Sequence, residues 1–238
     1  MNISGAVVFV TGASRGLGRA FAQIALAQGA KKVYAGVRDP SSFDIAGLVP
    51  IKLDVTDEAS VQAAAAQCQD TTLLINNAGI AMLTEDALDP QTFELLSRQM
   101  FDTNFYGVVR ASKAFAPVLA KNGGGAIINV LSDATWLSIP ILAAYAASKS
   151  AAWSFTNALR LQVRSAGTQV LALHVGFVDT ELTKDLDVPK SSKESVVKTV
   201  FGALEAGSEE VLADEGTQAI KASLSTASAV YLNPPMLG

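Results

Sequence analysis

Short apolar runs alternate along the chain with longer stretches in which apolar and polar residues repeat at helical spacing. The apolar runs predict buried strands, and they lie at residues 6–12, 31–37, 48–55, 71–79, 123–132 and 168–176. The stretches at helical spacing predict helices, and they lie at residues 16–29, 57–69, 90–100, 104–121 and 141–163. Continuous apolar strands separated by helices are typical of a doubly wound α/β fold, in which helices cover both faces of a parallel sheet.

This pattern also predicts the connections and the domain organisation. Right-handed crossovers place the carboxyl ends of all strands at one edge of the sheet, where such folds bind ligands. Residues 38–50 contain two prolines and little helical periodicity, so we expect a turn there instead of a crossover helix. The sequence has no internal repeat or linker, and its 238 residues suit a single domain over residues 1–238.

Composition and charge narrow the functional classes. Of the residues, 50% are hydrophobic and 17% are charged, which allows a large core. The net charge of −4 argues against nucleic acid or an anionic membrane as a partner. No apolar run approaches bilayer length, and the N-terminus lacks a signal-peptide pattern. Cys68 is the single cysteine, so we expect a cytoplasmic protein without a disulfide.

The single histidine, His174, excludes further chemistry. One histidine and one cysteine cannot build a zinc site of several His and Cys ligands. No G-x-S-x-G sequence precedes His174, which argues against a Ser-His-Asp hydrolase. His174 lies in an apolar run, so a hydrogen-bonded core histidine is the favoured interpretation.

A glycine-rich turn, TGASRGLG at residues 11–18, follows the first predicted strand and opens the first helix. In that position backbone N–H groups and the helix N-terminus face the pyrophosphate of a nucleotide, and glycines leave room for it. The spacing Gly12-x-x-x-Gly16-x-Gly18 differs from the dinucleotide fingerprint G-x-G-x-x-G. Taken alone, the turn is also compatible with an ordinary connection between a strand and a helix.

The end of the second predicted strand indicates which dinucleotide fits. A carboxylate there binds the ribose hydroxyls of NAD, whereas this chain has Val37 and Arg38. An arginine can pair with the 2′-phosphate of NADP, and Arg15 in the glycine turn adds a second positive charge. Both arginines can equally be solvated, and Asp39 reduces the local charge. We favour NADPH over NADH.

Two further polar turns end predicted strands. Asp54 and Val55 end the third strand, with Thr56 as the cap of the next helix. Asp54 is either a strand-end polar group or a partner of the adenine amino group. INNAG, at residues 75–79, ends the fourth strand and is by itself compatible with an ordinary turn. Because all these turns lie at the ligand-binding edge, they support the nucleotide interpretation together.

A tyrosine and a lysine, Tyr145 and Lys149, lie one turn apart in YAASK and therefore on one face of a helix. A free tyrosine titrates at about 10, and an adjacent ammonium stabilises the phenolate and lowers that pKa. Ser132 ends the fifth strand, where its hydroxyl can hold a carbonyl oxygen beside Tyr145. Asn104 is a natural N-cap of the helix at residues 104–121, and capping alone accounts for it.

Together these residues resemble the short-chain dehydrogenase/reductase family, in its compact single-domain branch, over about residues 5–180. The resemblance implies a three-layer α/β/α Rossmann fold with NAD(P) at its carboxyl edge. It also implies that Tyr145 is the acid/base, that Lys149 lowers its pKa and binds the ribose, and that Ser132 is the oxyanion partner. Asn104 is expected to hold a water that links Lys149 to solvent.

The resemblance further implies where the cofactor lies. The cofactor half covers about residues 1–130, and the catalytic and substrate half covers about residues 131–238. Besides Arg15, Arg38, Tyr145 and Lys149, the expected cofactor contacts are Gly12, Ser14, Gly16, Leu17, Gly18, Asp54, Val55, Asn76, Ala78, Gly79, Gly176, Val178 and Thr180. Members usually dimerise through the helices that begin near Asn104 and Tyr145, so we expect a homodimer or a homotetramer.

The chain departs from the family pattern in three places. The family commonly has Pro-Gly after the sixth strand, and here Val175 replaces the proline while Gly176 is retained. Asp133 follows the predicted catalytic serine, and a solvated or helix-capping carboxylate is favoured there over a catalytic one. The C-terminal segment lacks the usual glycine-rich closing strand.

The expected function is an NADPH-dependent carbonyl reductase that also runs as an alcohol dehydrogenase. Apolar residues near the reactive edge favour hydrophobic or aryl ketones and aldehydes, although packing in the core or a subunit contact also explains some of them. The residues expected in the substrate pocket are Ser132, Asp133, Trp136, Ile141 and Phe177. Two alternatives stay open, a non-catalytic NADP(H)-sensing protein and another reaction on the same fold, such as enoyl reduction.

Overall fold

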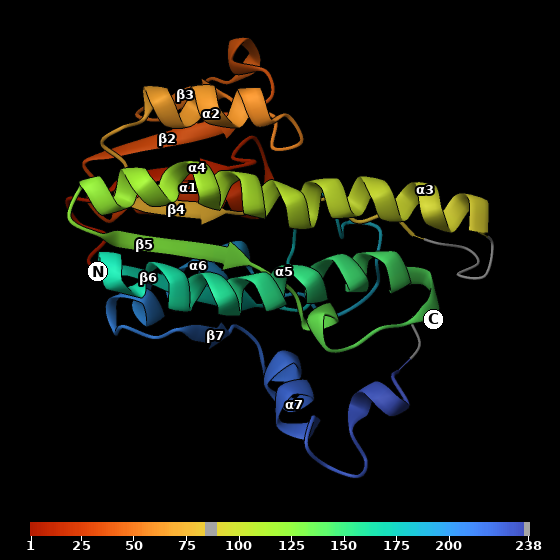
Figure 1. Cartoon of the computed structure of the whole chain (residues 1–238). Coiled ribbons are helices and arrows are strands. Elements are labelled where there is room, and N and C mark those ends of the chain that lie inside the picture. Colours follow the sequence, from red (N-terminus) through yellow and green to blue (C-terminus); the bar gives the residue numbers. More distant parts are fainter. Residues whose placement is uncertain (84–89, 236–238) are drawn as a thin grey trace.

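The structure is a computed structural model that describes residues 1–83 and 90–235. At its centre lies a seven-stranded parallel sheet with the strand order β3-β2-β1-β4-β5-β6-β7 (Figure 1). The strands are β1 (Val7–Thr11), β2 (Lys32–Val37), β3 (Val49–Lys52), β4 (Leu73–Asn76), β5 (Gly125–Val130), β6 (Thr168–His174) and β7 (Glu210–Leu212). The strand order reverses between β1 and β4, and such a switch point is where doubly wound folds bind ligands.

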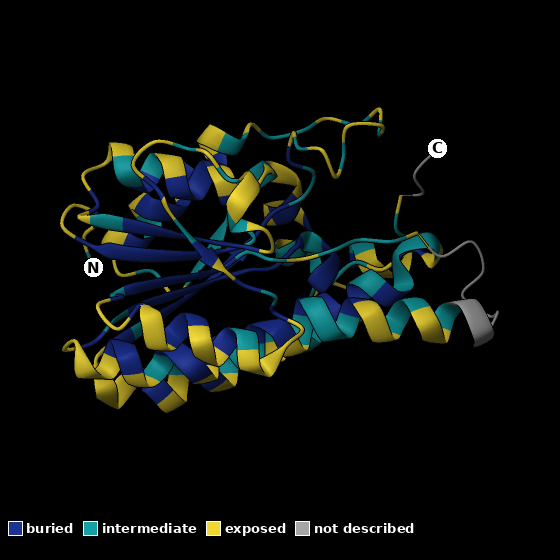
Figure 2. Ribbon diagram, turned by 90° about the horizontal axis from the view of Figure 1, so that it is seen from above, coloured by how far each residue is buried: buried dark blue, intermediate teal, exposed yellow. Residues whose placement is uncertain are grey.

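Helices cover both faces of the sheet, so the predicted three-layer α/β/α fold is confirmed. They are α1 (Gly16–Ala27), α2 (Glu58–Gln67), α3 (Pro90–Phe101), α4 (Gly107–Lys121), α5 (Ala143–Val163), α6 (Lys193–Glu205) and α7 (Glu215–Ser223). One hydrophobic cluster packs α1 and α6 on one face, and another packs α2, α4 and α5 on the other face. Figure 2 shows the buried strands enclosed between helices whose outer faces are exposed.

The structure differs from the sequence prediction mainly in the C-terminal part. β7 closes the sheet there, although no strand was predicted. It has three residues, all half-buried, because it is the edge strand, so its sequence has no continuous apolar run. The turn predicted between β2 and β3 is confirmed as a short 3-10 turn at Pro40–Ser42. Among residues 1–83 and 90–235, none of the helices is long and apolar enough to cross a membrane.

The N-terminal cap of α2 is also different from the prediction. Thr56 was expected to cap this helix, but Asp57 does so by accepting the N–H of Ala59 at 3.0 Å. Thr56 instead donates both its N–H and its hydroxyl to Asp54, at 2.9 Å and 2.7 Å. Both carboxylates thus close local turns at the carboxyl edge of the sheet.

Candidate active site

The glycine turn between β1 and α1 forms a cradle of the kind that a pyrophosphate needs. Gly12 and Gly16 have φ angles of 67° and 55°, in the left-handed region that favours glycine. A Cβ atom on Gly12 would lie 2.9 Å from the Cα atom of Ala78. α1 begins at Gly16 without a side-chain cap and without an acidic residue in its first turn. The turn therefore fits the phosphates of a dinucleotide, which bind at helix N-termini.

Two residues that the sequence analysis did not single out, Thr11 and Asn77, fix this turn to the end of β4. The Thr11 hydroxyl accepts hydrogen bonds from the N–H groups of Asn77 and Ala78, both at 3.0 Å. The Asn77 amide donates to the carbonyl oxygens of Thr11 and Gly12, at 3.0 Å and 3.2 Å. The shape of the cradle therefore depends on contacts between two strand ends that are far apart in the sequence.

Asn76, which was expected to contact the cofactor, has its side chain in the protein interior. It is 2% exposed, and its amide donates to Ser112 Oγ at 3.0 Å and to Asn129 Oδ1 at 2.8 Å. Successive side chains of a strand point to opposite faces, so only one of the two asparagines in INNAG can reach the glycine turn. That asparagine is Asn77, and Asn76 instead links β4 to α4 and β5.

Replacing Gly18 with alanine is expected to raise the dissociation constant for NADP(H) by about tenfold or more, which is about 1.4 kcal/mol. A Cβ atom on Gly18 would clash with the carbonyl oxygen of Gly12 and the amide nitrogen of Asn77. The turn would have to move away from the helix N-terminus that it shapes. The dissociation constant is measured by isothermal titration calorimetry.

The matched control is Gly202→Ala on α6, where an added Cβ meets no described atom within 4 Å. This variant should bind NADP(H) like the parent protein. An unchanged dissociation constant for Gly18→Ala would show that the turn is not the cofactor cradle.

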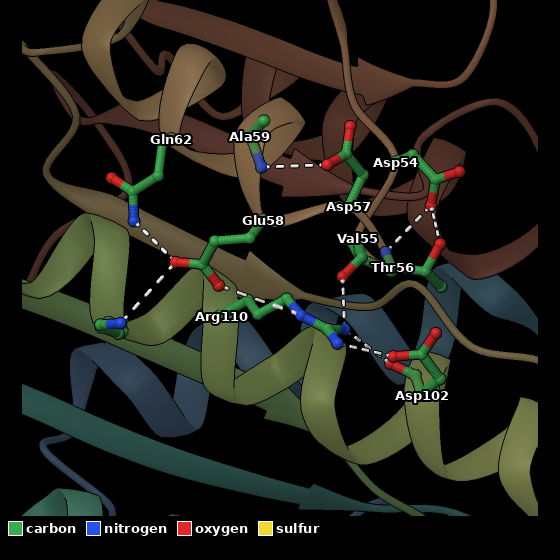
Figure 3. A network of polar contacts seen from close by, with 10 residues as sticks. Asp54, Val55, Thr56, Asp57, Glu58, Ala59, Gln62, Asp102 and Arg110 are labelled. Carbon is green, nitrogen blue, oxygen red and sulfur yellow. Dashed lines mark hydrogen bonds and ion pairs between the residues drawn. The ribbon is translucent and has the colours of Figure 1, made fainter.

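The turn after β3 carries Asp54 and Val55 and is held against α4 (Figure 3). Arg110 on α4 donates from Nη1 to the carbonyl oxygen of Val55 at 3.1 Å. Hydrogen bonds from Thr56 lower the pKa of Asp54, and the positive charge of Arg38 lowers it further. Asp54 is therefore an ionised hydrogen-bond acceptor at the carboxyl edge, and its carboxylate interacts electrostatically with Arg38.

Arg15 and Arg38 are both exposed beside the glycine turn. β1 pairs with β2 so that the residues that follow both strands lie at the same edge. Asp39 is turned away to Ser41, whose N–H and hydroxyl donate to the Asp39 carboxylate at 3.0 Å and 2.6 Å. In the described part of the chain no ion pair joins Asp39 to Arg38. Two exposed arginines thus follow neighbouring strands at the edge where the sequence predicts the 2′-phosphate.

The catalytic candidates meet where β5 ends and α5 begins. Ser132 follows β5, and the first two turns of α5 carry Tyr145 and Lys149. Lys149 is 5% exposed, and its ammonium donates to the carbonyl oxygen of Val130 at 2.9 Å. The same nitrogen lies 5.7 Å from the centroid of the Tyr145 ring. A phenol, a hydroxyl and an ammonium are therefore brought to one point of the carboxyl edge.

The acidity of Tyr145 differs from the expectation. Burial raises the pKa of Tyr145 to about 12, the nearby Ser132 hydroxyl lowers this pKa, and the charge of Asp133 raises it. Burial also lowers the pKa of Lys149 to about 8. The net lowering of the phenol pKa that was expected is therefore not found, because the cost of removing the phenolate from water is the largest of these effects. Tyr145 keeps its proton at neutral pH.

Asn104 lies in a π-helical turn, Asp102–Tyr106, that joins α3 to α4. It is therefore not an N-cap, and that prediction is wrong. Its Oδ1 accepts the N–H of Ile80 and its Nδ2 donates to the carbonyl oxygen of Ile80, both at 2.8 Å. A Cβ atom on Gly79 would lie 3.3 Å from Asn104 Oδ1 and 3.7 Å from Lys149 Nζ. The space beside Gly79 therefore borders the Asn104 amide and the Lys149 ammonium. Asn104 itself belongs to the π-helical turn, and such turns are frequent at functional sites.

The apolar residues expected in the substrate pocket, Trp136, Ile141 and Phe177, are all half-buried. The Trp136 ring stacks on His174 with a centroid distance of 4.0 Å. His174 is fully buried, and its Nδ1 lies 3.1 Å from the carbonyl oxygen of Ser132, so the predicted hydrogen-bonded core histidine is confirmed. One face of Trp136 is therefore used for packing behind Ser132.

The segment after β6 returns to the glycine turn. Val178 forms a parallel bridge with Ser191, which fixes the start of this segment. A Cβ atom on Gly16 would lie 3.6 Å from the Thr180 side chain. Thr180 therefore lies beside the glycine turn, and Gly176, in the same segment, borders Asp133 next to Ser132.

The comparison with protein families shows to which family the chain belongs. Residues 6–190 match the family model described as short chain dehydrogenase. The chain belongs to the short-chain dehydrogenase family. It is accordingly an oxidoreductase of a family that binds a nicotinamide cofactor and acts on small molecules. The glycine cradle, the phosphate-binding end of α1 and the catalytic candidates all lie within the matched residues.

Known short-chain dehydrogenases are similar to this chain over most of its length. A crystal structure of a short chain dehydrogenase from Burkholderia cenocepacia J2315 in complex with NADP is 37% identical, covers 95% of each chain and has a TM-score of 0.90. The 3-oxoacyl-(acyl-carrier-protein) reductase FabG of Salmonella typhimurium is 33% identical over 78% of this chain and 79% of its own length. The NADPH-dependent 1-acyldihydroxyacetone phosphate reductase of Schizosaccharomyces pombe is 38% identical over 74% of this chain and 60% of its own length.

Proposed function

We propose that this short-chain dehydrogenase is an NADPH-dependent carbonyl reductase that reduces hydrophobic or aryl ketones and aldehydes and that runs in reverse as an alcohol dehydrogenase. The observation that carries the proposal is the meeting of Ser132, Tyr145 and Lys149 beside the glycine cradle. A phenol and a hydroxyl placed side by side suit a carbonyl oxygen, which gains a proton as it is reduced.

The roles of the side chains follow from their chemistry. When bound, a reduced nicotinamide supplies the hydride. Tyr145 donates its proton to the carbonyl oxygen, and its pKa of about 12 keeps that proton available at neutral pH. Ser132 donates a hydrogen bond to the same oxygen. Lys149 contributes positive charge close to the phenol and so stabilises the phenolate that the proton transfer leaves behind.

The remaining groups complete the proposed site. Asn104 borders the space beside Gly79 and Lys149, where a water can connect the ammonium to solvent. Gly176, Val178 and Thr180 contact the nicotinamide end of the cofactor, and Asp54 contacts the adenine end. We also propose that the chain forms a homodimer or homotetramer, as is usual in the family.

The preference for NADPH rests on the two arginines and on the relatives. Arg15 and Arg38 are exposed at the end of the cradle, where a 2′-phosphate differs from a ribose hydroxyl. One similar structure is a complex with NADP, and one similar enzyme is named as NADPH-dependent. Both observations support NADPH as the working cofactor.

Replacing Arg38 with alanine is expected to raise the KM for NADPH by about tenfold or more and to leave the KM for NADH nearly unchanged. A charge-assisted hydrogen bond to the 2′-phosphate contributes about 1.5–3 kcal/mol, and NADH has no such group. The measurement is initial rates with both cofactors at a fixed ketone concentration. The control is Arg98→Ala, an exposed arginine of α3 that pairs with Glu94. Equal losses with both cofactors would mean that Arg38 does not bind the phosphate.

The substrate class follows from what surrounds the catalytic groups. Ile141 and Phe177 are half-buried, and the five residues expected in the pocket include no lysine or arginine. A half-buried apolar wall favours hydrophobic and aryl groups over phosphorylated or carboxylated ones.

The experiment that tests this function is NADPH consumption with a panel of carbonyl compounds. The panel contains aryl ketones, aliphatic ketones, a 3-oxoacyl thioester, sugars and enones, with NADH in parallel. The proposal expects turnover of aryl and bulky ketones with NADPH. A preference for the thioester would contradict the substrate class, and absence of turnover despite tight NADPH binding would favour the sensing protein.

A further inference from the structure

The hydroxyl proton of Ser132 already has an acceptor within the protein. Ser132 Oγ donates to Asp133 Oδ1 at 2.9 Å. The N–H of Ala134 donates to Ser132 Oγ at 3.1 Å and to Asp133 Oδ1 at 2.7 Å. A hydroxyl has a single proton, so Ser132 cannot donate to a carboxylate and to a substrate oxygen at the same time.

Asp133, which follows β5, lies next to a second carboxyl group, that of Asp214, which follows β7. A Cβ atom on Gly176 would lie 3.3 Å from Asp133 Oδ2 and 3.6 Å from Asp214 Oδ1. The Asp214 carboxylate caps the N-terminus of α7 by accepting a hydrogen bond from the N–H of Thr217 at 2.8 Å. It also accepts a hydrogen bond from the N–H of Gly176 at 2.8 Å. Asp133 therefore meets a like charge on one side and Ser132 on the other.

The other titratable groups that face Asp133 do not neutralise it. Tyr145, on α5, holds its proton, and Lys149, also on α5, donates to the carbonyl oxygen of Val130. His174, on β6, is neutral at pH 7 because burial lowers its pKa to about 4. No ion pair to Asp133 is found in residues 1–83 and 90–235. Burial raises the pKa of Asp133, and the charge of Asp214 raises it further.

We propose that Asp133 is a positioning residue whose protonation decides whether the Ser132 hydroxyl donates to the substrate or to Asp133. The proposal rests on the proposed carbonyl reduction. With Asp133 ionised, the Ser132 proton is held at Asp133 Oδ1. With Asp133 protonated, that acceptor is weaker and the Ser132 proton turns to the carbonyl oxygen. No bond is made or broken at Asp133, and Tyr145 still supplies the proton that the product gains.

The pH dependence of ketone reduction tests this assignment. As the pH rises through the pKa of Asp133, kcat/KM for reduction is expected to fall from an upper to a lower plateau by about tenfold or more, because a donor to the oxyanion is lost. Asp133→Asn has no charge to hold the Ser132 proton, so it should stay on the upper plateau. At neutral pH this variant is expected to reduce ketones faster than the parent protein.

Two further variants separate charge from structure. Asp214→Asn removes a like charge, so the fall in kcat/KM should move to lower pH, whereas Asp187→Asn, at an exposed position, should leave the profile unchanged. A faster Asp133→Asn variant cannot result from a damaged fold. The proposal would be overturned if the fall in kcat/KM with rising pH persisted in Asp133→Asn. It would also be overturned if Asp133→Asn reduced ketones more slowly than the parent protein at every pH.

A second measurement does not depend on turnover. The tyrosinate absorbance of the protein without cofactor is followed as the pH is raised, and the titration of Tyr145→Phe is subtracted to isolate Tyr145. Asp133→Asn is expected to lower the pKa of Tyr145, because the charge of Asp133 raises it. An unchanged titration of Tyr145 would overturn the coupling of Asp133 to the site, even if no ketone were reduced and the proposed function had failed by itself.

Discussion

Replacing Tyr145 with phenylalanine is expected to lower kcat/KM for ketone reduction by about 10³-fold, within the range of about 10²–10⁴ that a positioned acid contributes. The substitution removes only the hydroxyl that donates the proton, and the aromatic ring stays in place at the start of α5. The dissociation constant for NADPH should be nearly unchanged, because the cradle lies on β1 and α1. Steady-state rates give the first quantity, and fluorescence of the bound reduced nicotinamide gives the second.

The matched control for this variant is Tyr106→Phe. Tyr106 lies at the end of the π-helical turn and is 50% exposed, so the loss of its hydroxyl should leave turnover and binding unchanged. Retained turnover in Tyr145→Phe would contradict the assignment of Tyr145 as the acid/base. Loss of NADPH binding together with turnover would mean that the phenol acts in binding the cofactor instead of transferring a proton.

Replacing Lys149 with methionine is expected to lower kcat/KM by about 10²-fold and to weaken NADPH binding. Methionine keeps an apolar stem of similar length but cannot donate to the carbonyl oxygen of Val130, which Lys149 Nζ contacts at 2.9 Å. The variant also lacks the positive charge 5.7 Å from the Tyr145 ring, so the phenolate left after proton transfer is less stable.

The pH profile separates the charge of Lys149 from its packing. The pKa of Lys149 is lowered to about 8, so its charge is present below that pH and is lost as the pH rises through it. The parent protein should therefore lose reduction activity above about pH 8, and Lys149→Met should lack this step. Lys113→Met, whose parent side chain is 72% exposed on α4, is the control. A variant with the parent profile would exclude Lys149 from the reaction.

The central strands were predictable because the sheet is covered on both faces. β1, β4, β5 and β6 are buried almost throughout, so their sequences are continuous apolar runs that stand out from the helices. β7 was not predictable for the opposite reason. It has three half-buried residues at the edge of the sheet, and such a segment resembles a loop in sequence.

In the candidate site, too, the sequence predicted the positions set by local spacing but not those set by tertiary contacts. Tyr145 and Lys149 were found because helical spacing alone places them on one face. The choice between Asn76 and Asn77 was not open to sequence reasoning, because it depends on which side of β4 faces the glycine turn. The raised pKa of Tyr145 depends on burial by residues from several elements, and no local pattern encodes that.

The path of the hydride tests the proposed carbonyl reduction most directly. The protein is incubated with an α,β-unsaturated aryl ketone and NADPH that carries deuterium at both C4 positions of the nicotinamide, and the product is examined by NMR and mass spectrometry. We expect an allylic alcohol with one deuterium on the carbinol carbon and the double bond intact. Deuterium on the β-carbon of a saturated ketone would contradict the proposed carbonyl reduction in favour of enoyl reduction. No transfer, with NADPH bound, would contradict it in favour of a sensing protein.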